Sequence, residues 1–122
     1  MDSTRGIVLF AHGSRDERWR APVEAVARRV AELDPQVGVS CAYLELVQPD
    51  LRDAAEGLIR EGARTIRVLP LFLGMGRHVR EDLPRLLDEL RSRHPTVQFT
   101  LAGAVGEEQD VIELLARKAL DS

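Results

Sequence analysis

The stretch Gly6–Ala11, with the sequence GIVLFA, decides the fold because it is short, continuous and apolar. An apolar run without alternation, rich in β-branched residues, is typical of a strand that is buried on both faces of a parallel sheet. A polar segment, 12–16 (HGSRD), follows it directly. The sequence therefore predicts a buried strand whose carboxyl end leads into a polar loop.

The rest of the chain alternates between apolar runs and amphipathic runs. Further strands are expected over 37–46, 65–69 and 97–101, and a loop over 70–77. In the amphipathic runs the apolar residues recur three or four positions apart, as on one face of a helix. Helices are expected over 19–33, over 49–61 with Pro49 as the opening residue, over 79–93, and around 111–118.

The order of these elements predicts the fold class. Strands separated by single helices pair in parallel through right-handed crossovers. We expect an α/β fold of order βαβαβαβα, with a four-stranded parallel sheet in the order 2-1-3-4 and helices on both faces. The chain has 122 residues, which suits a single domain over 1–122.

Composition excludes several classes of protein. The net charge is -3, and the basic residues are scattered among acidic ones, which argues against nucleic acid and against an anionic membrane surface. No apolar stretch is long enough to span a bilayer, and the first residues do not resemble a signal peptide. The single cysteine, Cys41, lies in an apolar run and is expected to be a core residue. These features predict a cytoplasmic protein.

Three chemically active side chains are expected at one edge of the sheet. In open α/β sheets, ligands bind outside the carboxyl ends of the strands. His12 follows the first strand, the predicted second strand ends in Glu45, and the loop after the third strand ends at His78. With the strand order 2-1-3-4, His12 would lie between Glu45 and His78.

These residue types favour chemistry with a divalent metal. Neutral imidazole is a good ligand for such metals and can accept a proton near neutral pH, whereas carboxylate is a harder ligand. His12 and His78 are therefore candidate metal ligands, and Glu45 is a candidate proton acceptor. A purely structural role for the histidines stays open. His94, which precedes Pro95 at a helix end, is expected to be structural.

The loop glycines offer a second signal. Gly74 and Gly76 flank Met75, but the segment lacks the third glycine of a dinucleotide fingerprint and the Lys-Ser/Thr of a nucleotide loop. The glycines either let the backbone approach a flat ligand or serve a turn. Phe72 is expected in the core, and Trp19 either lies in a helix stripe or covers the loop at His12.

Three segments carry a resemblance to a known family: 11–19 (AHGSRDERW), 45–51 (ELVQPDL) and 70–79 (PLFLGMGRHV), the last followed by 82–84 (DLP). In this order and spacing they resemble the small, single-domain class II sirohydrochlorin chelatases, which include cobaltochelatases and ferrochelatases. The chain departs from the family at Leu83, where isoleucine is usual, and at Glu17, where proline is common. Neither departure affects a candidate ligand.

The resemblance implies a function. A divalent metal (cobalt, iron or nickel) would be inserted into sirohydrochlorin in cobalamin or siroheme biosynthesis, with the metal as a substrate and no permanent cofactor. His12 and His78 match the family's histidines, and Glu45 its pocket glutamate. Arg15 and Arg77, with the loop Gly74-Met75-Gly76, are candidates to bind the tetrapyrrole; Arg18 and Arg80 could also meet its carboxylates. A half-length chain of this kind would form a homodimer.

Two other functions remain open. A non-catalytic carrier of metal or tetrapyrrole would need the same ligands. A hydrolase is the other alternative, since the pair His12-Gly13 is similar to that of phosphohistidine phosphatases, but Ala11 stands where their arginine would precede the histidine. A G-x-S-x-G serine elbow is also absent from the sequence.

Overall fold

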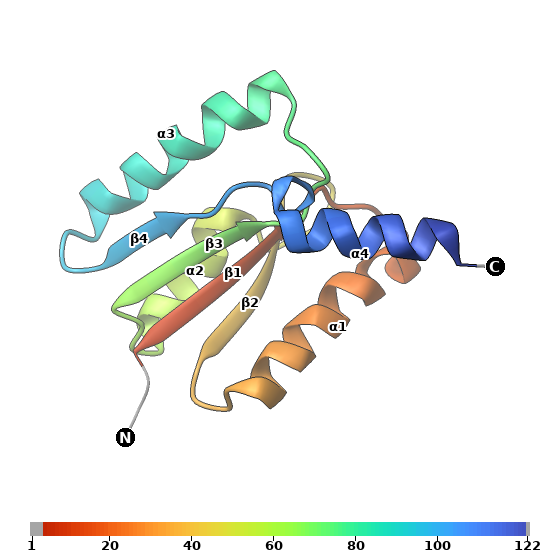
Figure 1. Cartoon of the computed structure of the whole chain (residues 1–122). Helices are drawn as coiled ribbons and strands as arrows, with labels where there is room; N and C mark the ends of the chain where they lie inside the picture. Colours follow the sequence, from red (N-terminus) through yellow and green to blue (C-terminus); the bar gives the residue numbers. More distant parts are fainter. Residues whose placement is uncertain (1–3, 122) are drawn as a thin grey trace.

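The computed structural model describes residues 4–121, so residues 1–3 and Ser122 of the predicted domain lie outside it. Four strands and four α-helices alternate along the chain, with a short 3-10 helix, η1, before the last α-helix (Figure 1). Their bounds are β1 Arg5–Ala11, α1 Glu17–Leu33, β2 Gly38–Tyr43, α2 Leu51–Arg60, β3 Thr65–Pro70, α3 Arg77–Arg93, β4 Gln98–Leu101, η1 Val105–Glu107 and α4 Gln109–Leu120.

The strands form one parallel sheet in the order β2-β1-β3-β4, which confirms the predicted topology. β1 lies at the centre, where Leu9 is in register with Cys41 of β2 and Leu69 of β3. Its middle residues Val8, Leu9 and Phe10 are at most 1% exposed. The apolar run at the start of the chain is therefore the strand on which both halves of the sheet assemble.

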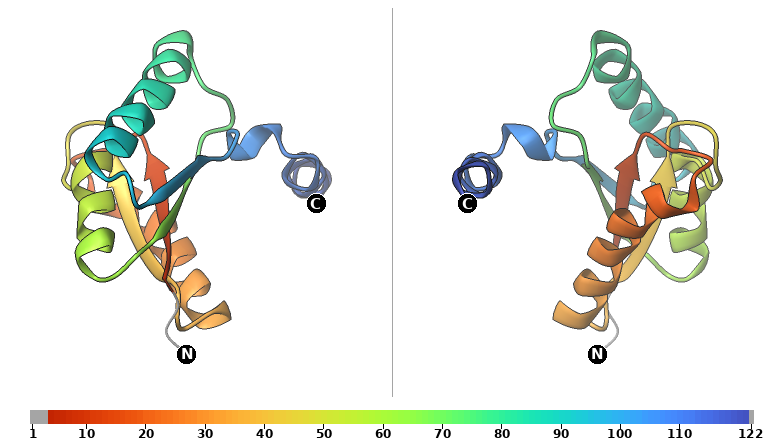
Figure 2. Two further views of the ribbon diagram at one scale, coloured as in Figure 1. Left: turned by 90° about the vertical axis from the view of Figure 1, so that its left-hand side faces the viewer. Right: turned by 90° about the vertical axis from the view of Figure 1, so that its right-hand side faces the viewer.

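Helices cover the two faces of the sheet unequally. On one face, α2 and α3 pack Leu58, Leu83 and Leu87 against strand residues such as Val8 and Phe10. On the other face, α1 packs Val23 against a smaller cluster around Leu9, Ala11 and Tyr43. Figure 2 shows α2 and α3 on one side of the sheet and α1 on the other. The predicted covering of both faces is confirmed for these three helices.

Helix α4 contributes nothing to this core. None of its residues is buried, and Ile112, Leu114 and Leu115 are 42%, 55% and 45% exposed. Its most extensive contacts are with η1, and in Figure 2 it stands clear of the sheet. No helix within residues 4–121 is both long and apolar enough to traverse a bilayer.

Two predicted boundaries around the second strand are wrong. β2 ends at Tyr43 instead of continuing to 46, and the backbone bends in the segment that follows: Leu46 has a φ of 74° and the Val47 N–H donates to the carbonyl oxygen of Glu45 over 2.9 Å. Pro49 does not open α2. Asp50 precedes the helix, and its carboxylate accepts a hydrogen bond of 2.8 Å from the Asp53 N–H, the usual role of an N-cap aspartate.

The loop after the third strand is also shorter than predicted. Pro70 still belongs to β3, and α3 already begins at Arg77, so Arg77 and His78 lie in the first turn of a helix and not in the loop. The helix starts early because Gly76 takes the extended N-cap conformation, without any side-chain cap. The expected helix start at Val79 followed the apolar periodicity, which begins only after the first, polar turn.

A candidate active site at the carboxyl edge of the sheet

His12 lies directly after β1 and is exposed at the carboxyl edge of the sheet. One face of its imidazole is supported by Phe72, whose ring centroid lies 4.3 Å away at an interplanar angle of 43°. Phe72 is itself only 4% exposed and meets Phe10 of β1 edge to face, with centroids 5.8 Å apart. A stack of aromatic rings therefore connects the exposed imidazole to the hydrophobic core.

The loops after β1 and β2 are joined by backbone hydrogen bonds. The Leu44 N–H donates to the Ala11 carbonyl over 2.9 Å, and the Glu45 N–H donates to the His12 carbonyl over 3.0 Å. Gly13 has a φ of 101°, and a Cβ at this position would overlap the carbonyl oxygen of Glu45. The predicted neighbours His12 and Glu45 thus do meet, through their backbones, and the contact requires glycine at 13.

The side chain of Glu45 is exposed beside a hollow of about 440 Å³. The residues that line the hollow all belong to the segment from Tyr43 to Asp50. Its size lies in the range of small-molecule sites. A carboxylate in this position can exchange protons with solvent and with any ligand bound at the carboxyl edge.

His78 is carried on the amino-terminal end of α3, and in Figures 1 and 2 this end of the helix stands apart from the carboxyl edge of the sheet. His78 is exposed in the first turn of α3, which follows the carboxyl end of β3 through the loop 71–76. Within that loop a Cβ on Gly74 or Gly76 would meet no atom within 4 Å, and neither glycine has a positive φ. The open space above the backbone of Gly74 and Gly76 favours the interpretation that these glycines let a flat ligand approach closely. It does not favour the alternative that a turn requires them. Met75 packs against the core and is only partly accessible.

The two candidate arginines lie on separate segments of the chain, the loop after β1 and the start of α3. Arg15 is exposed in the polar loop before α1. Arg77 is also exposed, and its Nε lies 3.3 Å from a carboxylate oxygen of Glu81 one turn along α3. A pair this exposed is weak and leaves the guanidinium free to exchange partners.

One chain does not assemble a complete metal site. Within residues 4–121, no three His, Cys, Asp or Glu side chains are placed to share a metal ion. His12, His78 and Glu45 therefore do not form a three-ligand cluster, contrary to the convergence that the topology suggested. A metal bound here would complete its coordination with water, with another ligand or with another chain, which suits a metal that is handled transiently.

Two side chains of β2, those of Cys41 and Tyr43, have surroundings that favour their neutral forms. Burial, and secondarily Glu24, raises the pKa of the Cys41 thiol, which donates weakly to the Val23 carbonyl at 3.9 Å. This supports the core role predicted for Cys41, because a neutral thiol is a poor metal ligand. Burial also raises the pKa of Tyr43. The indole of Trp19 lies 6.3 Å from the Tyr43 ring, so Trp19 covers the end of β2.

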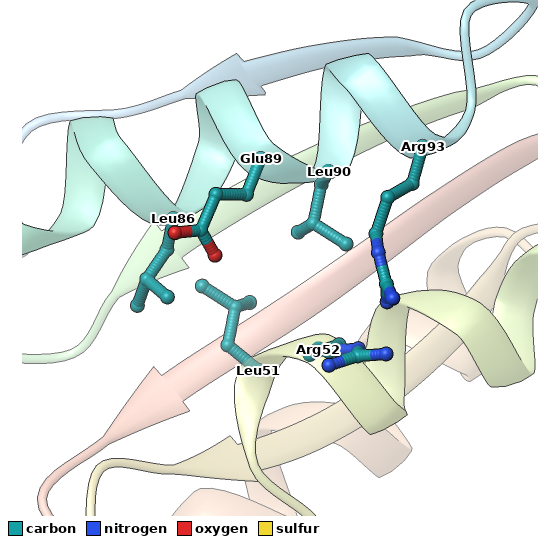
Figure 3. A pocket seen from close by; sticks show the side chains of 6 residues that line it. All are labelled: Leu51, Arg52, Leu86, Glu89, Leu90 and Arg93. Carbon is teal, nitrogen blue, oxygen red and sulfur yellow. The ribbon is translucent and has the colours of Figure 1, made fainter.

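A second cavity lies away from this edge, between α2 and α3 (Figure 3). Leu51, Leu86 and Leu90 form its apolar part, and Arg52 and Arg93 flank it. Its volume of about 40 Å³ is close to the roughly 30 Å³ that one water occupies. It has no room for a macrocycle, so the carboxyl edge is the better candidate site.

His94 is structural, as its place at a helix end suggested. Its Nε2 lies 2.9 Å from Oε2 of Glu56, which joins the C-terminal end of α3 to α2. The hydrogen bond to His94, aided by Arg52 and Arg93 and partly opposed by burial, lowers the pKa of Glu56. His94 therefore links two helices and is not a candidate ligand.

Gly106, in η1, contacts the loop after β3 although no sequence pattern indicated it. The Gly106 N–H donates to the Phe72 carbonyl over 3.0 Å, and a Cβ here would overlap the backbone of Leu73. The segment after β4 is thus pressed against the loop that carries Phe72. The only sequence signal was a glycine between an apolar residue and two glutamates, which predicts nothing by itself.

The chain is similar to known proteins over most of its length. The family model described as CbiX matches residues 6–122. A sirohydrochlorin cobaltochelatase of Saccharolobus solfataricus is 30% identical over 119 residues, covering 93% of this chain and 91% of the relative.

Solved structures give the same fold. The CbiX protein from Marinobacter aquaeolei VT8 superposes with a TM-score of 0.78 at 33% identity, covering 95% of this chain and 93% of that one. The sirohydrochlorin chelatase SirB from Bacillus subtilis subspecies spizizenii, in complex with cobalt, gives a TM-score of 0.79 at 23% identity, with 98% of this chain but only 50% of that one covered. The resemblance predicted from the three motifs is confirmed, and the chain belongs to the CbiX family.

Proposed function

We propose that this protein is a chelatase that inserts a divalent metal, Co²⁺, into sirohydrochlorin. The observation that carries the proposal is His12, an exposed imidazole held on the ring of Phe72 at the carboxyl edge of the sheet. Full-length relatives support the substrate: those from Saccharolobus solfataricus and Sulfolobus acidocaldarius are named sirohydrochlorin cobaltochelatases, and this chain covers 91% and 89% of them.

Cobalt is favoured by the names of the relatives of similar length, although a longer relative from Priestia megaterium, of which this chain covers 38%, is also named a cobaltochelatase. The relatives of similar length carry the name cobaltochelatase, including the one from Methanosarcina barkeri, of which this chain covers 99%. The ferrochelatase name appears on longer chains, such as the Arabidopsis thaliana enzyme, of which this chain covers 49%. Histidine and carboxylate ligands accept cobalt, iron and nickel alike, so the competing metals belong in the test.

The reaction exchanges two protons for one metal ion. Co²⁺ binds to His12 and His78, with water at its other positions, and the tetrapyrrole presents its nitrogens from the open side. Two metal–nitrogen bonds replace two pyrrole N–H bonds, and the two protons pass to a released imidazole and to Glu45, and then to solvent. The His12 imidazole holds the metal at the place where the tetrapyrrole ring binds. Much of the rate of metal insertion therefore comes from proximity.

The loop after β3 receives the macrocycle. Gly74 and Gly76 leave space above the backbone for a flat ring, and Met75 offers an apolar edge. Arg15 and Arg77 pair with the carboxylates of the tetrapyrrole, since guanidinium binds carboxylate bidentately.

We further propose that the whole chain forms one domain, acts in the cytoplasm and works as a homodimer. The free thiol of Cys41 is compatible with a reducing compartment. The dimer is supported by the ligand count, because within residues 4–121 one chain offers no three-ligand group. Each site can be completed by water, by substrate or by the second copy.

The proposal is tested by an anaerobic insertion assay with sirohydrochlorin and Co²⁺, Fe²⁺ or Ni²⁺, followed by absorption spectroscopy. The protein should turn over many equivalents, and His12→Ala and His78→Ala should each lower the rate at least about 100-fold, as expected for loss of an acid–base and ligand group. His94→Gln is the matched control and should keep the rate. A spectral change that stops at one equivalent would identify a carrier instead.

A further inference from the structure

The loop 71–76, which carries Phe72, is held by backbone hydrogen bonds at two successive residues. The Leu71 N–H donates to the Phe10 carbonyl of β1 over 2.8 Å, and the Phe72 carbonyl accepts a bond of 3.0 Å from the Gly106 N–H of η1. The first bond ties the loop to the central strand, and the second ties it to the segment that follows β4. The backbone of Phe72 is therefore fixed from both sides.

Gly106 approaches this loop too closely for any side chain to fit between them. A Cβ at Gly106 would overlap the Cα, the carbonyl carbon and the carbonyl oxygen of Leu73, all of which are backbone atoms. Backbone atoms in a packed region cannot swing aside as the end of a flexible side chain can, so a larger residue must displace the loop or η1. Gly106 has no positive φ, so its own conformation does not require glycine. The requirement comes from the loop.

A second glycine of the same segment provides the contrast. Apart from its own neighbours in the chain, the nearest atom to a Cβ on Gly103 would be a carboxylate oxygen of Glu107, at an ordinary contact distance of 3.8 Å. Gly103 is exposed and, like Gly106, has no positive φ. The two glycines therefore differ in whether a side chain would push against the loop 71–76.

The loop holds the ring of Phe72 between the core and the exposed imidazole of His12. The Phe72 ring lies 5.8 Å from that of Phe10 and 4.3 Å from that of His12, measured between centroids. Phe10 is 1% exposed in the central strand, whereas His12 is exposed after the end of that strand. A displaced Phe72 ring will consequently change its contact with the imidazole more readily than its contact with the core.

We propose that Gly106 is a positioning residue for His12, because it lets η1 close onto the loop and so holds the Phe72 ring against the imidazole. Gly106 itself touches neither metal nor tetrapyrrole and acts through Phe72. The imidazole after β1 is thus held in place by the segments that follow β3 and β4. The effect on metal binding rests on the proposed function, whereas the contact between the two rings does not.

The first test measures this contact without metal or tetrapyrrole, by NMR at constant pH. The ring current of Phe72 shifts the carbon-bound imidazole protons of His12, whose signals are assigned by their absence in His12→Gln. Phe72→Leu shows where these signals lie once the contact is lost. Gly106→Ala should move them most of the way to that position, whereas Gly103→Ala should leave them where they are in the parent. Unmoved signals in a folded Gly106→Ala protein would overturn the proposal.

The affinity for Co²⁺ separates an effect through Phe72 from a general structural effect. In calorimetric titration, Gly106→Ala should weaken binding about 5-fold, the loss expected when the aromatic support is removed, and Gly103→Ala should not weaken it. In a Phe72→Leu background, Gly106→Ala should cause no further loss, because residues that act through one another are not additive. Losses that multiply to about 25-fold would show that Gly106 acts independently of Phe72, against the proposal.

Hydrogen exchange in the parent protein adds a readout that does not require any variant to fold. As the donor to the Phe72 carbonyl, the Gly106 amide should exchange at least about 10-fold more slowly than the amide of the exposed Gly103. Equal rates would show that η1 is not bonded to the loop, and the proposal would fail.

These measurements keep the inference apart from the proposed function. If the His12 signals respond to Gly106→Ala but the protein inserts no metal, the positioning of the imidazole stands and the proposed function fails. If the protein turns over but the His12 signals do not respond, the proposed function stands and the positioning role fails.

Discussion

At the scale of single residues, His12 depends on Phe72. The imidazole is exposed, and an exposed side chain normally samples several rotamers. Contact with a buried ring, 4.3 Å from centroid to centroid, restricts the orientations that the imidazole can take. Aromatic pairs of this kind contribute about 0.5–1.5 kcal/mol beyond burial.

Replacing the supporting ring should therefore weaken metal binding without removing a ligand. For Phe72→Leu we expect the affinity for Co²⁺, measured by calorimetric titration, to fall about 5-fold, equivalent to about 1 kcal/mol. Phe99→Leu, at a buried phenylalanine of β4, is the control: it should cost comparable stability and leave the affinity unchanged. Equal losses of affinity in the two variants would mean that Phe72 acts only through the core.

Gly13 gives a second prediction at this scale. Its φ of 101° and its contact with the Glu45 carbonyl exclude a side chain. Gly13→Ala should lower the free energy of unfolding by more than about 1 kcal/mol, because a non-glycine residue is strained there and must also push the Glu45 loop away. Gly74→Ala, where a Cβ meets nothing, should change it by less than about 0.5 kcal/mol in the same denaturant titration.

The sequence indicated where His12 and Glu45 lie, because strand ends and strand order are readable from apolar runs. It did not indicate the contact with Phe72. That contact depends on how a loop of six residues folds over the edge, and apolar periodicity carries no information about loop conformation. The ligand roles of His12 and His78 stay predictions until metal binding is measured.

At the scale of elements, the ends of helices and strands were the weak points of the sequence analysis. α3 begins at Arg77, so His78 projects from a helix turn and not from a loop. The polar first turn concealed the helix start, and the bends after Tyr43, which include the left-handed Leu46, ended β2 before the expected strand end at 46. Both errors arise from backbone turns that residue type alone does not specify.

The junction between α2 and α3 gives a prediction about pH. The hydrogen bond from His94, and then Arg52 and Arg93, hold the pKa of Glu56 below its ordinary value of 4.5. A lowered carboxyl pKa means stabilisation that is complete above 4.5 and is lost as the pH falls through the lower, folded-state value.

Glu56→Gln should therefore cost about 1 kcal/mol of unfolding free energy at neutral pH, the usual worth of a partly exposed charged hydrogen bond. The difference from the parent should shrink below pH 4.5, as followed by thermal unfolding. Glu32→Gln, whose carboxylate pairs with Arg29 at 3.0 Å but is 65% exposed, should show no difference at any pH. A cost for Glu56→Gln that persists unchanged in acid would assign the effect to packing.

At the scale of the whole molecule, the alternation of strands and helices was enough to predict the sheet and its order. When buried strands are joined by single crossover helices, only a few sheet topologies are possible. The observed order, β2-β1-β3-β4, is one of these. The position of α4 could not be predicted in this way. Its periodicity indicates an apolar face but does not say what that face packs against, and none of its residues is buried in the structure.

The ring of Phe72 belongs to two parts of the molecule at once. It fills the interior beside Phe10, and its outer face seats the imidazole of His12. Under the proposed function, a substitution that repacks the interior at Phe72 is therefore expected to change turnover as well as thermal stability. Packing and reactivity would then share one side chain and could not evolve independently.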